Sequence, residues 1–250
     1  MEWSAPVIIL AIRPYGEGHV VATVFGAEQG ARRGLARGGA SRRAAALWQP
    51  GNLVSARWIG RLAEQLGSLS AEMIYPTAAL AMEDGLALAM LNAALALVEG
   101  ALPEHEAQPK VFAGLIDLIP HLTEGPAVLA DFVRWEIALL AALGYGLDLS
   151  RCAVTGSNVG LGFVSPRTGR AVSAEAAGPW RERLLPLPPF VLGPAPSQPG
   201  DWRDGLKLTG YFLAHNVFAL KHRPLPQARG LLYDRVVAMA SETEHACRIL

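Results

Sequence analysis

The stretch "APVIILAIRPYGEGHVVATVFGAEQGARRGLAR", residues 5–37, holds three short apolar segments that glycine, proline and charged residues separate. The segments cover residues 5–13, 18–26 and 31–37, and two more follow at 52–60 and 67–75. Short runs rich in Val, Ile and Thr and bounded by turn residues are typical of β-strands. The first third of the chain therefore predicts five strands.

Five strands in so short a segment are enough for a small closed barrel and too few for a two-sheet sandwich. The oligonucleotide/oligosaccharide-binding fold (OB-fold) is a five-stranded barrel of this kind. We predict an OB-fold domain over residues 1–76 that binds DNA, with a small SH3-like barrel as the structural alternative.

The next part of the chain has helical spacing. Apolar residues dominate residues 77–102, 109–122 and 125–146, and residues 77–102 contain no proline. In the third segment one apolar stripe recurs at i+3 and i+4, as expected of a helix face that packs on a core. Its members are Val128, Phe132, Trp135, Leu139 and Leu143. We predict a helical domain over residues 77–250 and an α+β fold overall.

Residues 150–173 interrupt the helical pattern with glycines and a Ser-Pro pair, which predicts a small β-turn-rich insert. Helical signals return at 173–185, where Ser173 could cap the helix, and again at 204–221 and 227–239.

Composition limits the cellular setting. The chain has 250 residues, 51% of them hydrophobic, but acidic residues interrupt its longest apolar stretch, residues 76–102, so no membrane span is expected. The N-terminus lacks the basic region of a secretory signal, and Cys152 and Cys247 alone give no disulfide framework. We expect a cytoplasmic protein.

Charge is balanced over the chain but not along it. Residues 1–75, 76–150 and 151–250 carry net charges of +3, −8 and +5. Seven arginines and no acidic residue lie between Glu28 and Glu64. They are Arg32, Arg33, Arg37, Arg42, Arg43, Arg57 and Arg61.

An acid-free run of arginines suits a polyanion, because binding gains from the release of counterions condensed on phosphates. If about five of these arginines contact single-stranded phosphates, log K falls with log salt at a slope of about −3.5. A solvated basic loop is the alternative. Gly38 and Gly39 would let this loop turn and bring backbone N–H groups close to a ligand.

Aromatic residues could add base stacking. The candidates are Tyr15, Phe25, Trp48 and Trp58, which alternatively fill the barrel. A second, weaker basic region comprises Arg151, Arg167, Arg170, Arg181 and Arg183. The sequence contains no H-E-x-x-H zinc motif and no G-x-x-x-x-G-K-[ST] phosphate loop, so we do not expect an enzyme.

Four stretches in order, "LARGGASRRAAALWQPGNLV", "FVRWEIALLAALGYGLDLSRCAVTG", "FVSPRTGRAVS" and "LKLTGYFL", resemble the RecO family of bacterial recombination mediators. The resemblance spans nearly the whole chain. It implies an N-terminal OB-fold, a helical domain with a zinc-finger-like insert, and no catalytic activity. It further implies DNA repair by binding single- and double-stranded DNA, annealing complementary strands and, with RecR, loading recombinase onto strands covered by single-strand-binding protein.

The insert departs from zinc-bearing relatives, which carry four cysteines in two C-x-x-C pairs. Here the residue three positions after Cys152 is Thr155 and not a second cysteine. Ser173 and Ala176 occupy the positions of the second C-x-x-C pair. One cysteine cannot supply the four ligands that structural zinc needs. We therefore expect no metal and no cofactor, a Cys152 that is a small buried residue, and an insert held by packing of Leu161, Phe163 and Val164.

The resemblance also implies a site for the acidic, phenylalanine-ended tail of single-strand-binding protein. Such a ligand needs a cation beside an apolar pocket, and Arg134 lies nearest the matching family position. The alternative for Arg134 is an ion pair with Asp131 or Glu136. For the whole chain, an OB-fold RNA-binding or general interaction module remains the competing hypothesis.

Overall fold

The computed structural model describes residues 1–62 and 65–249, without the side chains of residues 247–249, so the side chain of Cys247 lies outside the described part. The chain forms two compact units, Met1–Thr123 and Glu124–Leu250. Among the described residues, no helix combines the length and hydropathy that crossing a bilayer requires.

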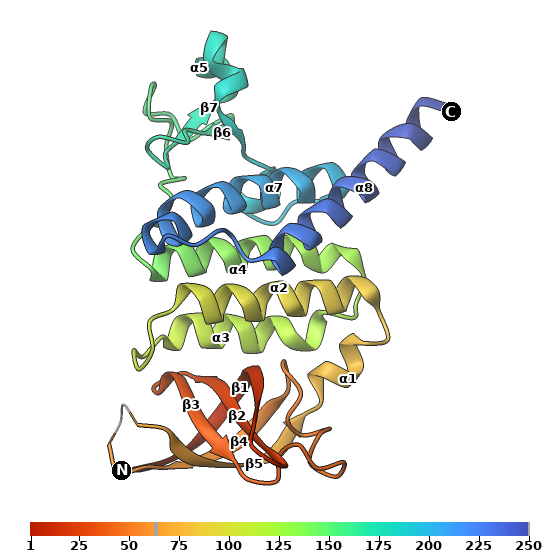
Figure 1. Cartoon of the computed structure of the whole chain (residues 1–250). Helices are drawn as coiled ribbons and strands as arrows, with labels where there is room; N and C mark the ends of the chain where they lie inside the picture. The colour runs from red at the N-terminus through yellow and green to blue at the C-terminus, as the bar shows by residue number, and fades with distance from the viewer. Residues whose placement is uncertain (63–64, 250) are drawn as a thin grey trace. The chain divides into compact units, whose positions relative to one another are not determined.

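The first unit contains a closed barrel of five strands: β1 (Glu2–Tyr15), β2 (His19–Gly26), β3 (Gly30–Ala36), β4 (Leu53–Ile59) and β5 (Gly67–Tyr75). The strands pair in the order β1-β2-β3-β5-β4, and β1 closes the barrel on β4. Figure 1 shows this barrel in red and orange, with the N-terminus at its edge. The predicted five-stranded OB-like barrel and the α+β class are confirmed.

The barrel interior follows the two-residue period of the strands. On β4, Val54, Ala56 and Trp58 are buried while Arg57 and Ile59 point outward. The core also takes residues from β1, β2 and β5 and Trp48 from the loop between β3 and β4. The alternation accounts for strands that could be located from sequence.

Three helices follow the barrel within the first unit: α1 (Thr77–Ala81), α2 (Gly85–Ala101) and α3 (Pro109–Leu118). The stretch predicted to be helical, residues 77–102, forms two helices, α1 and α2, because Asp84 starts a new helix. Its side chain accepts hydrogen bonds from Leu86 N (2.6 Å) and Ala87 N (3.0 Å), as an N-cap residue does.

Helices α2 and α3 pack against β1 and β2 and cover one end of the barrel (Figure 1). Phe112 of α3 meets Phe25 of β2 edge to face, with ring centroids 5.6 Å apart. These helices share a compact unit with the barrel, whereas the division into domains 1–76 and 77–250 stays a prediction.

The second unit is built on α4 (Leu129–Ala142), α7 (Pro199–Phe212) and α8 (Gln227–Ile249), with short helices α5 (Ala174–Ala177) and α6 (Pro189–Leu192). Val128, Phe132, Trp135 and Leu139 of the predicted stripe are buried, and Leu143 is half-buried. The predicted helix over 204–221 starts earlier, at Pro199, and its later part continues as a π-helical turn over Leu213–Phe218 and a 3₁₀ turn over Ala219–Lys221.

The insert contributes β6 (Leu161–Val164) and β7 (Ala171–Ser173) to a three-stranded sheet in the order β7-β6-β8, and the third strand, β8 (Leu185–Pro186), follows the insert in the chain. Ser173 caps α5 as expected, since its Oγ accepts a hydrogen bond from Ala176 N at 3.3 Å. The helix predicted over 173–185 is shorter, and a 3₁₀ segment replaces it from Gly178 to Arg183.

Candidate nucleic-acid interface

The arginine-rich segment 37–43, called the basic loop below, begins where β3 ends. Its backbone is tied to the turn between β1 and β2. Gly38 N donates to His19 Nδ1 at 2.9 Å, and Ala40 N donates to Gly18 O at 3.2 Å. Residues after Ser41 form a helical turn, with Ala45 N donating to Ser41 O at 2.9 Å. The loop is therefore held by hydrogen bonds next to one end of the barrel.

The two glycines of the basic loop serve different purposes. Gly38 has a positive φ of 69°, in the left-handed region that glycine adopts without steric cost. Gly39 does not need a positive φ, but a Cβ there would lie 2.6 Å from Val20 Cγ2 and 3.2 Å from Trp48 Cδ1. Gly38 thus allows the turn, and Gly39 allows the loop to approach the barrel core.

Three arginines of the basic loop project into solvent. Arg37, Arg42 and Arg43 are exposed, and no carboxylate lies within ion-pair distance of them in the part of the chain that the structure describes. Arg61, just beyond β4, is exposed as well. The basic loop is the most concentrated positive surface that the predicted residues form.

Other predicted arginines have partners that the sequence could not indicate. Arg33 Nη2 lies 3.0 Å from Glu104 Oε2, and Arg57 Nη2 lies 2.6 Å from Glu2 Oε1. Arg32 donates from Nε to Gln29 O at 3.1 Å. The run of seven arginines is acid-free in the sequence, but the fold brings the carboxylates of Glu104 and Glu2 to it.

The four aromatic candidates separate into core and surface. Phe25, Trp48 and Trp58 are buried, and Trp58 Nε1 donates to Arg33 O at 3.0 Å. Tyr15 is 53% exposed. It pairs with His19 across the β1–β2 ladder, and His19 bonds the basic loop. Tyr15 is therefore the candidate that can stack on a base beside the basic loop.

The second basic region is more closely bound to its surroundings. Arg170 Nε lies 3.3 Å from Asp148 Oδ2. Hydrogen bonds from Ser150, and to a smaller extent Arg170, hold the pKa of Asp148 below its usual range. Arg181 and Arg183 lie over aromatic rings, those of Phe163 and Trp180. Arg151 and Arg167 are exposed.

Arg134 is engaged by its neighbours. Its Nη1 lies 2.6 Å from Asp131 Oδ1, the ion pair considered as an alternative, and its Nε donates to Phe190 O at 3.1 Å. The guanidinium also lies over the Phe190 ring, 5.5 Å from its centroid. Glu136, the other suggested partner, is buried and bonds Arg229 instead.

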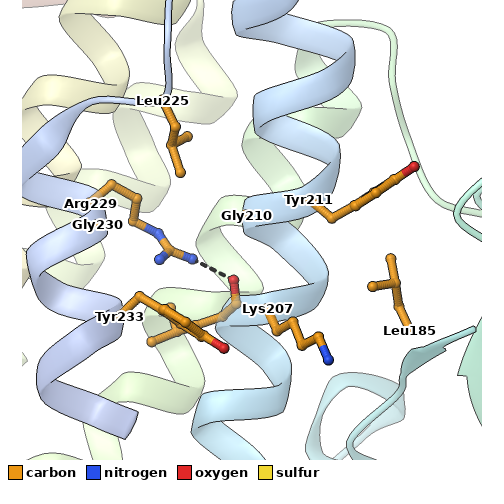
Figure 2. Close-up of a pocket in the computed structure, with 9 residues that line it drawn as sticks. Leu185, Lys207, Gly210, Tyr211, Leu225, Arg229, Gly230 and Tyr233 are labelled. Atoms are coloured by element: carbon orange, nitrogen blue, oxygen red, sulfur yellow. Dashed lines mark hydrogen bonds between the residues drawn. The ribbon is translucent and has the colours of Figure 1, made fainter. Parts of the chain in front are cut away.

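An apolar pocket of about 310 Å³ lies elsewhere in the second unit. No motif in the sequence indicated it. Figure 2 shows the side chains that surround it, with Lys207 and the two tyrosines among them. Arg229 donates from Nη2 to Leu206 O at 2.8 Å, the hydrogen bond drawn in Figure 2. The lining residues are Leu185, Leu206, Lys207, Gly210, Tyr211, Leu225, Arg229, Gly230 and Tyr233.

Cys152 is buried at the centre of the insert, against Val172 and Ala177. Its Sγ accepts hydrogen bonds from Ser173 N (3.3 Å) and Thr155 N (3.5 Å). Burial favours the neutral thiol, but the hydrogen bonds from Thr155 and Ser173 outweigh it and lower the pKa of Cys152 to about 6. Within the described residues, three or more His, Cys, Asp or Glu side chains are nowhere gathered as a metal site.

Comparison of the sequence with known proteins identifies the family of this chain. Residues 1–77 match the family model "Recombination protein O N terminal", and residues 82–225 match "Recombination protein O C terminal". Three proteins named "DNA repair protein RecO" are similar over almost their full length. Identity is 58% for that of Granulibacter bethesdensis (98% of this chain, 100% of the relative), 50% for that of Gluconacetobacter diazotrophicus (98% and 99%) and 52% for that of Acidiphilium cryptum (94% and 96%). The chain belongs to the RecO family.

Proposed function

We propose that this protein acts in DNA repair as a recombination mediator. It binds single- and double-stranded DNA, anneals complementary strands and, with RecR, helps load recombinase onto strands covered by single-strand-binding protein. It does this in the cytoplasm and without catalysing a covalent reaction. The observation that carries the proposal is the basic loop on an OB-like barrel, where Arg37, Arg42 and Arg43 are exposed.

The contacts of the basic loop with DNA are electrostatic in this proposal. Arg37, Arg42 and Arg43 contact phosphates, with Arg61 as a fourth cation. Arg33 and Arg57 join only after their carboxylate partners are displaced. Three to four contacts with single-stranded phosphates give a slope of log K against log salt of about −2 to −3, shallower than five contacts would give.

The test is binding of labelled single-stranded DNA over a salt series, together with annealing of complementary strands. Replacing Arg42 and Arg43 by Glu should weaken binding to all sequences alike and make the salt slope shallower. A double replacement of Arg223 and Arg235 by Glu is the matched control, because both are exposed arginines of the second unit that belong to neither basic region. Unchanged affinity of the Arg42→Glu/Arg43→Glu variant at low salt would overturn the site.

RNA binding is the competing activity for an OB-like barrel. Competition between single-stranded DNA and RNA of equal length separates the two. Preference for RNA would move the protein to the alternative class, whereas annealing of DNA without nucleotide or metal supports the mediator.

The tail of single-strand-binding protein is the second proposed partner. An acidic tail that ends in phenylalanine needs an apolar pocket with a cation at its side. Arg134 was the sequence candidate, but it is held by Asp131 and Phe190. Lys207 lines an apolar pocket of about 310 Å³. We therefore propose that the tail binds in this pocket and that Arg134 contributes less to its binding than Lys207.

A further inference from the structure

A second cavity, also of about 310 Å³, lies in the first unit. It is lined by Val21, Arg33, Gln65, Leu66, Glu104 and His105. Val21 belongs to β2 and Arg33 to β3, two strands that pair along their length. Leu66 directly precedes β5, whose first residue pairs with Gly34 of β3. The cavity therefore lies where β2 and β3 meet the two residues directly before β5, on a strand face that OB-folds use to bind oligonucleotides.

The walls of the cavity combine the chemistry that a nucleotide needs. Val21 and Leu66 supply apolar surface, and Leu66 is 47% exposed. Gln65 supplies hydrogen-bonding groups for the edge of a base, and Arg33 supplies a cation for a phosphate. The volume is at the lower end of the range for small-ligand sites, which starts at about 300 Å³.

The cavity is connected to the basic loop along β3. Residues two apart on a strand point to the same face, so Arg33 and Leu35 lie in one row on β3, and Arg37 follows directly after Ala36, the last residue of that strand. A strand rises about 3.3 Å per residue, so Arg33 lies about 10 Å from Ala36. A nucleic-acid strand that runs along β3 toward the basic loop would contact Arg33 and Arg37 and pass the cavity.

His105 is held at the rim in an unusual conformation. Its φ is +67°, in the left-handed region that residues other than glycine rarely adopt. Its backbone N donates to Ala31 O at 3.1 Å, and Gln108 N donates to Ala27 O at 3.0 Å, so this segment is docked on the barrel. Its Nδ1 is buried without a hydrogen-bond partner among the described residues. Backbone strain of this kind concentrates at ligand sites.

We propose that this cavity receives one nucleobase of bound single-stranded DNA, while Arg33 contacts the adjacent phosphate in place of Glu104. The inference rests on the proposed function and adds a base-binding site to its phosphate contacts. A base in a duplex is stacked and paired and cannot enter without being extruded. The cavity therefore favours single-stranded over double-stranded DNA.

The test compares a short oligothymidylate with an abasic sugar-phosphate chain of the same length. The full-length protein should bind the oligothymidylate about tenfold more tightly, because the abasic chain keeps the phosphates and lacks the bases. Val21→Trp, which fills the cavity, and Leu66→Asn, which removes an apolar wall, should each abolish most of this preference and leave binding of the abasic chain unchanged.

Ile74→Asn is the matched control, because Ile74 is a similarly exposed aliphatic residue of the same barrel that does not line the cavity. Leu66→Asn alters an exposed position, so it decides the question even if Val21→Trp fails to fold. Equal binding of both chains by the wild type, or an unchanged preference in Leu66→Asn, overturns the cavity proposal and leaves the basic loop intact. Failure to bind either chain overturns the proposed function itself.

Discussion

The carboxylate of Glu104 and the guanidinium of Arg33 lie 3.0 Å apart, although 71 positions separate the two residues in the chain. About half of each side chain is exposed. The segment that carries Glu104 is docked on the first residues of β3 through a bridge to Ala31. A phosphate that binds Arg33 must therefore compete with an acidic group of the protein.

Replacing Glu104 by Gln should tighten binding of single-stranded DNA by up to about fivefold at low salt, because an exposed ion pair contributes at most about 1 kcal/mol. Glu99→Gln is the control, since Glu99 faces a different arginine, Arg13, at 3.8 Å. Fluorescence anisotropy at low and high salt measures the difference. Equal affinities of the two variants would show that Glu104 does not compete with DNA.

The glycines of the basic loop should respond differently to substitution. Gly39→Ala puts a Cβ against Val20 and should reduce the free energy of unfolding by about 1–3 kcal/mol. Gly38→Ala meets no atom within 4 Å but adopts a left-handed conformation, at a cost of about 1–2 kcal/mol. Urea unfolding of the two variants measures these changes.

Asparagine separates the backbone effect at Gly38 from the steric effect at Gly39, because asparagine tolerates the left-handed region better than alanine. Gly38→Asn should therefore be more stable than Gly38→Ala. Gly39→Asn should be at least as destabilised as Gly39→Ala, because Val20 leaves no room for a side chain at this position. The opposite order at either position would contradict the assignment.

Cys152 predicts a pH-dependent stability. Its pKa is about 6 in the folded protein and 9.0 for an unperturbed thiol, so the unfolded chain binds more protons between these values. Stability from the thiolate is therefore complete above pH 9, falls as the pH drops, and is lost below about pH 6.

Urea unfolding of the wild type and of Cys152→Ala under reducing conditions checks this dependence. The difference between their free energies of unfolding should grow as the pH rises from about 6 to about 9. Cys247 is present in both proteins and cancels. A difference that is the same at both ends of the interval would mean that Cys152 stays a thiol in the folded state.

The buried ion pair of Arg229 and Glu136 should affect stability mainly because each charge neutralises the other. Both side chains are buried, Arg229 Nη2 lies 2.9 Å from Glu136 Oε2, and Thr209 also donates to this carboxylate. Arg229→Met leaves a buried carboxylate without its cation and should destabilise the second unit by about 3–5 kcal/mol.

The double variant Arg229→Met/Glu136→Leu removes both charges and should recover most of that loss, because a buried ion pair is often no better than apolar residues of similar size. Thermal unfolding followed by circular dichroism compares the two. A double variant as unstable as the single one would show that the hydrogen bonds to Leu206 and Thr209 dominate.

The pocket of Figure 2 can be tested with the tail peptide. Lys207→Glu should weaken binding of an acidic peptide that ends in phenylalanine by at least about tenfold, because it replaces attraction with repulsion at the pocket. Arg134→Gln should have a smaller effect, since Arg134 is already paired with Asp131. Calorimetric titration with the peptide measures both affinities. A larger loss of affinity in Arg134→Gln than in Lys207→Glu would show that the tail binds at Arg134.

The barrel was predictable because its strands alternate between buried and exposed residues and are bounded by turn residues. The break before α2 was missed because Asp84 occurs within an apolar, proline-free run, and only its hydrogen bonds to Leu86 and Ala87 reveal a cap. Likewise, a count of apolar and aromatic residues could not separate Tyr15, which is exposed, from Trp58, which fills the barrel.

By itself the sequence determined the five-stranded barrel, the helical region after it and a glycine-containing arginine loop, because these depend on local periodicity and composition. The tertiary structure decided which arginines of the acid-free run between Glu28 and Glu64 have no carboxylate partner among the described residues and remain available to bind phosphate. Glu2 and Glu104, distant along the chain, reach Arg57 and Arg33, while Arg37, Arg42 and Arg43 stay exposed. Ion pairs form between side chains that folding brings within a few ångströms, and strand pairing sets that proximity, which sequence spacing does not encode.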